Sequence, residues 1–105
     1  MASARALILL ALLGGCQAQA EGPSADVAAS VRAGDTRIIV RAGRGQMAPG
    51  IPAELQAEAK ARCGVRTLEG LGDVVRPEQR EAYNKRLAYA VEYNRLMLSH
   101  CPVAK

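Results

Sequence analysis

Large aromatic side chains are scarce in this sequence. Phe and Trp are absent, and the only three aromatics are Tyr83, Tyr89 and Tyr93. The core must therefore be built from Leu, Val, Ile and Ala, each of which buries less area than an aromatic ring. A chain of 105 residues with such a thin core allows one small domain, and domains of this kind usually need a covalent or metal staple.

Histidine is equally scarce, since His100 is the only one, and a catalytic triad or a His-based metal site has little to draw on. His100, Cys63 and Cys101 together offer three zinc ligands. Neighbouring helical positions, however, point about 100° apart, and oxidation would remove both thiolates. The sequence has no C-x-x-C pair and no C-x-x-C-H haem attachment. We therefore predict no metal, no cofactor and no catalytic site, with a small envelope hydrolase as the disfavoured alternative.

Long apolar runs are also missing. The longest one, residues 6–13, remains far below the roughly 20 residues that a membrane-spanning helix needs, even when it is extended to Cys16. Arg5 precedes this run and small residues follow it. That order, of a positive charge, a short apolar core and small residues, is typical of a secretory signal peptide.

The residues that end the run, Leu13-Gly14-Gly15-Cys16, resemble the lipobox of bacterial lipoproteins, which is an aliphatic residue, two small residues and a cysteine. The resemblance covers only this end of the chain and identifies no family for the remainder. It implies a signal peptide over residues 1–15 and a lipidated Cys16, whose acyl chains hold the protein to a membrane. Because Gln17 is not the aspartate that retains such proteins at the inner membrane, the resemblance implies an outer-membrane lipoprotein facing the periplasm.

A second interpretation ends the signal at Ala18-Gln19-Ala20, an A-x-A site for ordinary signal peptidase. Cleavage there would release a soluble periplasmic protein. Under the lipoprotein interpretation, the short, polar and turn-forming residues 16–24 predict a tether, and residues 25–105 form the domain.

Three cysteines are present, Cys16, Cys63 and Cys101. If Cys16 carries lipid, an even pair remains, and the oxidising compartment that an exported chain enters predicts a Cys63–Cys101 disulfide. The bond would close a loop of about forty residues and stabilise a thin core by about 3–4 kcal/mol in the chain-entropy model.

The remaining sequence predicts an α+β domain in the order strand, helix, strand, helix. Residues 36–42 are β-branched and alternate apolar side chains with arginines, which predicts a strand, and residues 65–68 predict a shorter one. Residues 52–63 and 77–100 predict helices that each begin with a proline. A chain that runs outward over residues 65–75 and returns as a long helix brings Cys101 back to Cys63.

Each predicted helix has a stripe of residues that we expect to be buried, because they recur at helical spacing. The stripe of the first helix comprises Leu55, Ala59 and Cys63. The stripe of the second comprises Tyr83, Leu87, Ala90, Val91, Asn94, Leu98 and Cys101.

Residues 25–33 fit two structures. Ser24 is a suitable cap for a short Ala-rich helix that ends at Gly34. As a strand, the same residues form an N-terminal hairpin with residues 36–42 across a two-residue turn at Gly34 and Asp35. The sequence does not separate the two.

Charge is mild, with a net +4 over the whole chain. The cluster Arg32, Arg37, Arg41 and Arg44 either faces anionic lipid or peptidoglycan, or is a solvated surface. Nucleic acid is a poor partner for an exported protein.

Two further pairs have alternative roles. Glu69 and Asp73, four residues apart and near glycines, suit acid–base work or are surface carboxylates. Tyr89 and Tyr93 form either an exposed patch that binds a partner or part of the packing. We expect a non-enzymatic envelope lipoprotein that binds or protects another envelope component, either a protein or peptidoglycan, in an oligomeric state that the sequence leaves open.

Overall fold

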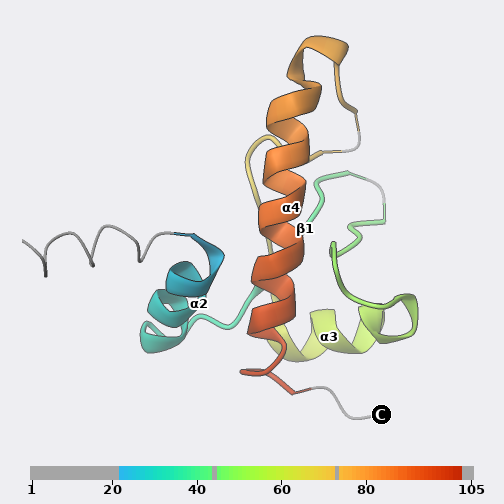
Figure 1. The fold of residues 1–105 in the computed structure, drawn as a ribbon. Coiled ribbons are helices and arrows are strands. Elements are labelled where there is room, and N and C mark those ends of the chain that lie inside the picture. The colour runs from blue at the N-terminus through green and yellow to red at the C-terminus, as the bar shows by residue number, and fades with distance from the viewer. Residues whose placement is uncertain (1–21, 44, 73, 103–105) are drawn as a thin grey trace, which may run out of the picture.

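The computed structural model describes residues 22–43, 45–72 and 74–102, and in this part of the chain it forms a small α+β domain (Figure 1). A first helix, α2 (Pro23–Arg32), precedes the predicted order of strand, helix, strand, helix. The four elements of that order are β1 (Ile38–Val40), α3 (Gln56–Cys63), β2 (Val65–Thr67) and α4 (Arg80–Met97). Short 3₁₀ turns, Ala53–Leu55 and Pro77–Gln79, lead into α3 and α4. The proposed lipobox and lipidated Cys16 lie outside the described residues.

Residues 23–32 form a helix, so the N-terminal hairpin is wrong. Pro23 occupies the first turn, Asp26 follows it there, and Arg32 lies in the last turn, which places each charge favourably for the helix dipole. Val27 is the buried residue of α2, and α2 packs along α4. The helix begins two residues before the predicted start of the domain.

The sheet has two parallel strands, with Ile38 opposite Val65 and Val40 opposite Thr67. β1 is shorter than the predicted 36–42, and its burial does not alternate, because Ile38, Ile39 and Val40 are all fully buried. A parallel strand that is covered on both faces commonly has a continuous apolar run of this kind.

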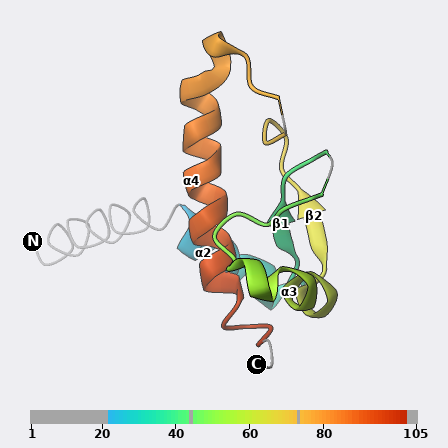
Figure 2. The ribbon, with the colours of Figure 1, turned by 90° about the vertical axis from the view of Figure 1, so that its right-hand side faces the viewer.

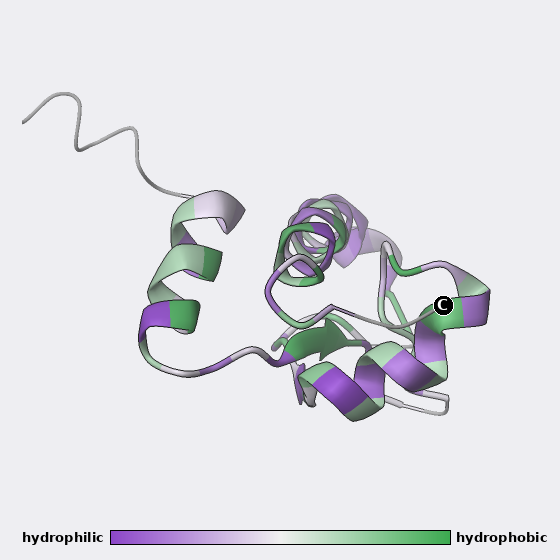
Figure 3. Cartoon of the chain, turned by 90° about the horizontal axis from the view of Figure 1, so that it is seen from below, coloured by the Kyte–Doolittle hydropathy of each residue, from purple (hydrophilic) through white to green (hydrophobic). Residues whose placement is uncertain are grey.

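α4 packs against both β1 and α2. Viewed along α4, α2 lies to one side of it, while the sheet and α3 lie on another (Figure 3). Four members of the predicted stripe, Tyr83, Ala90, Asn94 and Cys101, are buried, and Leu87 and Leu98 are partly buried against the core. Val91, which we expected in the core, is 37% exposed. Because α2 covers α4 as well as β1 does, the buried face also includes Tyr93 and Met97. The helix ends at Met97, three residues before the predicted end.

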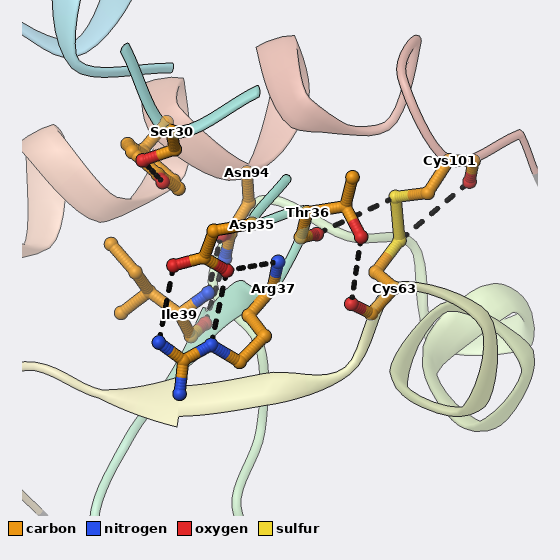
Figure 4. A network of polar contacts seen from close by, with 9 residues as sticks. Ser30, Asp35, Thr36, Arg37, Ile39, Cys63, Asn94 and Cys101 are labelled. Atoms are coloured by element: carbon orange, nitrogen blue, oxygen red, sulfur yellow. Dashed lines mark hydrogen bonds and ion pairs between the residues drawn. A yellow bond between two sulfur atoms is a disulfide. The ribbon is translucent and has the colours of Figure 1, made fainter. Parts of the chain in front are cut away.

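The disulfide between Cys63 and Cys101 is present, with an S–S distance of 2.00 Å and a Cα–Cα distance of 5.5 Å. Cys63 is the last residue of α3, and Cys101 follows the end of α4. Both cysteines are buried beneath Thr36, whose hydroxyl donates a hydrogen bond to the carbonyl of Cys63 at 3.2 Å (Figure 4). The predicted disulfide therefore joins the C-terminal end of α3 to the residues that follow the C-terminal end of α4.

Two buried amides hold the backbone where the sheet has no further strand. The Asn94 side chain accepts a hydrogen bond from the Ile39 N–H at 2.7 Å and donates one to the Ile39 carbonyl at 2.8 Å (Figure 4). Gln56 binds the N–H and the carbonyl of Ala48 in the same two-point manner. Asn94 thereby substitutes for a third strand on the outer edge of β1, where unpaired backbone groups would otherwise be buried.

The N-terminal half of α4 extends beyond the sheet, and the segment after β2 runs alongside it (Figure 2). We call residues 68–86, which comprise this segment and the projecting half of α4, the arm. Among the helices that the structure describes, none is long and apolar enough to cross a membrane.

Candidate functional site

A cavity of about 810 Å³ lies at the arm. It opens between residues 67–72, 74 and 75 on one side and one face of α4 on the other. This volume is within the range of small-molecule binding sites. The apolar side chains that line it are Ala42, Leu68, Leu71, Val74, Val75, Ala82 and Tyr83.

Backbone hydrogen bonds fix the floor of this cavity. Leu71 is almost fully buried, its N–H bonds to the carbonyl of Leu68, and its carbonyl accepts the Ala42 N–H at 3.0 Å. The Tyr83 hydroxyl donates to the Gly72 carbonyl at 3.3 Å. These contacts attach the segment after β2 to the loop after β1 on one side and to α4 on the other.

A second pocket of about 400 Å³ adjoins the first, since Leu68 and Arg86 line both. Its other lining residues are Asp26, Arg66, Lys85 and Tyr89. The Arg86 side chain lies over Gly70 at the junction, where a Cβ on Gly70 would come within 2.7 Å of the Arg86 Nε. We call the two pockets together the α4 groove.

The two ends of the groove differ in charge. Arg66, Lys85 and Arg86 contribute three positive charges to the end nearer α2, and Asp26 contributes one negative charge there. None of the ion pairs among the described residues, Arg37–Asp35, Arg62–Glu58 and Arg95–Glu92, uses any of these three cations. At the arm end, Glu69 is the one carboxylate among the described lining residues.

Tyr89 and Asp26 join α4 to α2 at the cationic end. The Tyr89 hydroxyl donates a hydrogen bond to the Asp26 carboxylate. Burial, and then this hydrogen bond, raises the pKa of Tyr89 above its usual value of 10.0. The phenol therefore remains neutral throughout the physiological pH range, and the Asp26 carboxylate keeps the hydrogen bond that Tyr89 donates.

Two arginine side chains also rest on tyrosine rings. The guanidinium carbon of Arg66 lies 4.9 Å from the centre of the Tyr93 ring, and that of Arg41 lies 5.8 Å from the Tyr83 ring. Both distances are within the range of cation–π attraction. The Arg41 Nε is buried without a hydrogen-bond partner among the described residues.

The predicted arginine cluster is not gathered at one place. Arg37 pairs with Asp35, and this bond lowers the pKa of Asp35 to about 2. Arg32 instead lines a shallow pocket with His100, and Arg41 packs on Tyr83. The fourth member, Arg44, lies outside the described residues.

The other predicted pairs are also separated. Glu69 lines the groove, but Asp73 lies outside the described residues. Tyr89 and Tyr93 stack with ring centres 5.9 Å apart, yet Tyr93 is fully buried and donates to the Ser30 hydroxyl. An exposed tyrosine patch is therefore wrong for Tyr93, and both rings serve the packing of α2 on α4.

No cluster of three His, Cys, Asp or Glu side chains suited to a metal ion occurs within the described ranges. The two thiols that we considered as zinc ligands are joined in the disulfide. Their oxidation removes the thiolates that metal binding by these cysteines would require.

Sequence reasoning missed the cationic end of the groove. Lys85 and Tyr89 are four residues apart on a helix, which predicts a shared face. Arg66, however, reaches this face from β2, and only the three-dimensional arrangement shows that contact. Compared with family models, curated proteins and solved structures, the chain matches none of them.

Proposed function

We propose that this protein is a non-enzymatic lipoprotein of the bacterial cell envelope, anchored through Cys16 to the outer membrane and facing the periplasm. Its domain binds or protects another envelope component through the α4 groove. The proposal combines the lipobox resemblance at one end of the chain with the α4 groove of the domain.

The observation that carries the proposal is the pairing of the cysteines. Cys63 and Cys101 are joined to each other, which leaves Cys16 as the odd one of three. This residue directly follows the apolar run and the small residues Gly14 and Gly15. A structural disulfide also suits an oxidising compartment, so the domain and the signal-like segment favour the same location.

The groove favours binding over catalysis. Its described lining contains no histidine and no thiol, and a nucleophile paired with a base is not found there. It does combine an apolar floor with a few charged side chains, as binding sites commonly do.

Metabolic labelling with radioactive palmitate tests the anchor. We expect the wild-type chain to incorporate label and to sediment with outer-membrane vesicles, and the Cys16→Ala chain to do neither. Label that persists in Cys16→Ala would overturn lipidation at this residue. A soluble, unlabelled wild-type chain that begins near Glu21 would instead establish cleavage after Ala20.

Site-specific photocrosslinking tests the binding role. A photoreactive amino acid in place of Val74, which is 86% exposed in the arm, should form a discrete adduct in envelope preparations. The matched position is Glu54, which is also exposed but lies beside α3. If both positions give the same set of adducts, the groove is not the binding surface.

A further inference from the structure

We infer that the α4 groove binds a single-chain anionic amphiphile, an alkyl chain that ends in a phosphate or a carboxylate. This inference names the ligand class of the proposed binding role and so rests on that role. It does not depend on the Cys16 anchor.

The alkyl chain fits the arm end of the groove. Leu68 and Val75 supply partly exposed aliphatic surface from the segment after β2, Ala82 supplies it from α4, and Leu71 and Tyr83 lie buried beside them. Val74 at the margin is almost fully exposed, although valine is a residue that folding normally buries. An alkyl chain along this surface would remove apolar area from water, at a gain that grows with each methylene buried.

The anionic head fits the other end. Arg66 comes from β2, while Lys85 and Arg86 come from α4, so two separate elements contribute cationic side chains to the lining of one pocket. Asp26 is the one carboxylate among its lining residues, and Tyr89 already satisfies it with a hydrogen bond. The pocket thus keeps a net charge of about +2, and guanidinium groups bind phosphate and carboxylate oxygens in a fork geometry.

Arg86 sets the boundary between the two ends. Its guanidinium lies over Gly70 and lines both pockets. A ligand whose apolar part fills the arm end therefore presents its terminal group to Arg86 first. A groove with aliphatic side chains at one end and an excess of positive charge at the other suits a molecule with one chain and one head, which is why we favour an amphiphile over an acidic polypeptide.

The experiment uses the full chain in envelope vesicles and three photoreactive probes with the same diazirine-bearing alkyl chain. Their heads are phosphate, carboxylate and trimethylammonium. We expect the phosphate or carboxylate probe to label residues 68–75 and 82–83, as mapped by mass spectrometry. The trimethylammonium probe should give about tenfold less adduct there, because it forfeits the charge-assisted hydrogen bonds to the cations. The stronger of the two anionic probes identifies the head group.

The test variant is Arg66→Gln/Lys85→Gln/Arg86→Gln, and the matched control is Arg32→Gln/Arg62→Gln/Arg95→Gln, which removes three exposed cations elsewhere. Labelling by the anionic probes should fall about tenfold in the first and remain unchanged in the second. Circular dichroism on each variant verifies folding, and Arg86→Lys, which keeps the charge, should retain part of the labelling.

Equal labelling by all three probes, adducts scattered over the surface, or unchanged labelling in the triple variant would each overturn the inference. Adducts to an acidic protein from the vesicles, displaced by no probe, would favour a polypeptide ligand instead. Palmitate incorporation and probe labelling of the wild-type chain separate the outcomes. Groove adducts in a wild-type chain that incorporates no palmitate would leave the ligand class standing while the anchor fails. Palmitate on Cys16 without groove adducts would leave the anchor standing while the ligand class fails.

Discussion

Asn94 and Gln56 each pair with a backbone segment as a strand would. Asn94 is fully buried, and its amide satisfies both polar groups of Ile39 together with the Pro49 carbonyl. Buried backbone groups are costly when unpaired. A single side chain therefore terminates a two-stranded sheet that would otherwise need a third strand.

Asn94→Ala should reduce the free energy of unfolding by about 3 kcal/mol or more, because it leaves buried backbone groups without partners at about 1–3 kcal/mol each. Urea denaturation monitored by circular dichroism measures the change. Asn84→Ala, on the exposed face of the same helix, is the control and should shift stability by less than about 0.5 kcal/mol. Similar losses for the two variants would disprove the strand-like role of Asn94.

Tyr89 makes stability sensitive to alkaline pH. Its pKa is raised in the folded chain, so the folded state keeps a proton that the unfolded state loses above pH 10. The contribution is fully present below pH 10 and disappears as the pH rises toward the folded pKa. We expect unfolding free energy to fall above pH 10 more steeply in wild type than in Tyr89→Phe, measured by urea denaturation at several pH values.

A spectrophotometric titration of the tyrosines provides the independent check. In the native protein, the ionisation signal of Tyr89, taken as the difference between wild type and Tyr89→Phe, should appear above pH 10. A Tyr89 signal centred near pH 10 in a folded chain would contradict the raised pKa.

At the scale of elements, the order of strands and helices could be predicted because each carries a local signal. The β-branched run predicted β1. Pro52 and Pro77 predicted the starts of α3 and α4 and lie just before these helices, and Gly64 follows the last residue of α3. Residues 25–33 could not be assigned, because Val27 and Val31 satisfy both the helical and the strand spacing. Only the packing of Val27 against α4 decides between them.

The candidate site was less predictable than the fold. The buried face of α4 depends on α2 as well as on β1, and the sequence of α4 alone does not reveal the angle between them. The burial of Tyr93 and Met97 and the exposure of Val91 follow from this, as does the cationic pocket that Arg66 completes from β2. Glu69 and Tyr89 were the predicted candidates that line the groove.

Gly50 shows how closely the loop after β1 approaches α4. Its φ is +83°, and a Cβ would lie 2.8 Å from the Val91 carbonyl oxygen, which is backbone and cannot easily move. Gly34 has nearly the same φ, +81°, but nothing lies within 4 Å of its Cβ position. Substitutions at the two glycines therefore distinguish the cost of backbone strain alone, at Gly34, from the cost of strain together with a steric clash, at Gly50.

Gly34→Ala should lower stability by about 1 kcal/mol from the left-handed backbone conformation alone. Gly50→Ala should lower it by a further 1–3 kcal/mol or so, because the loop must shift away from α4. Thermal or urea unfolding of both variants gives the difference. Equal losses would mean that the loop moves aside without cost.

At the scale of the whole molecule, the disulfide compensates for a core that lacks Phe and Trp. Cys63 and Cys101 are separated by 38 residues, and closing such a loop stabilises the fold by about 4 kcal/mol in the chain-entropy model. Cys63→Ala/Cys101→Ala should lose about that much, and adding reductant to wild type should reproduce the loss. Reductant should have no effect on the double variant, and any effect there would point to another thiol.

The disulfide also makes a covalent ring of residues 63–101, with the arm as its far end. A protease that cuts the chain once within the arm would therefore release nothing, because both fragments remain joined through the sulfurs. The chain would thus survive a single nick in the arm with the parts on both sides of the cut still in one covalent piece. Only a second cut within the ring, or a reductant, would let a fragment leave.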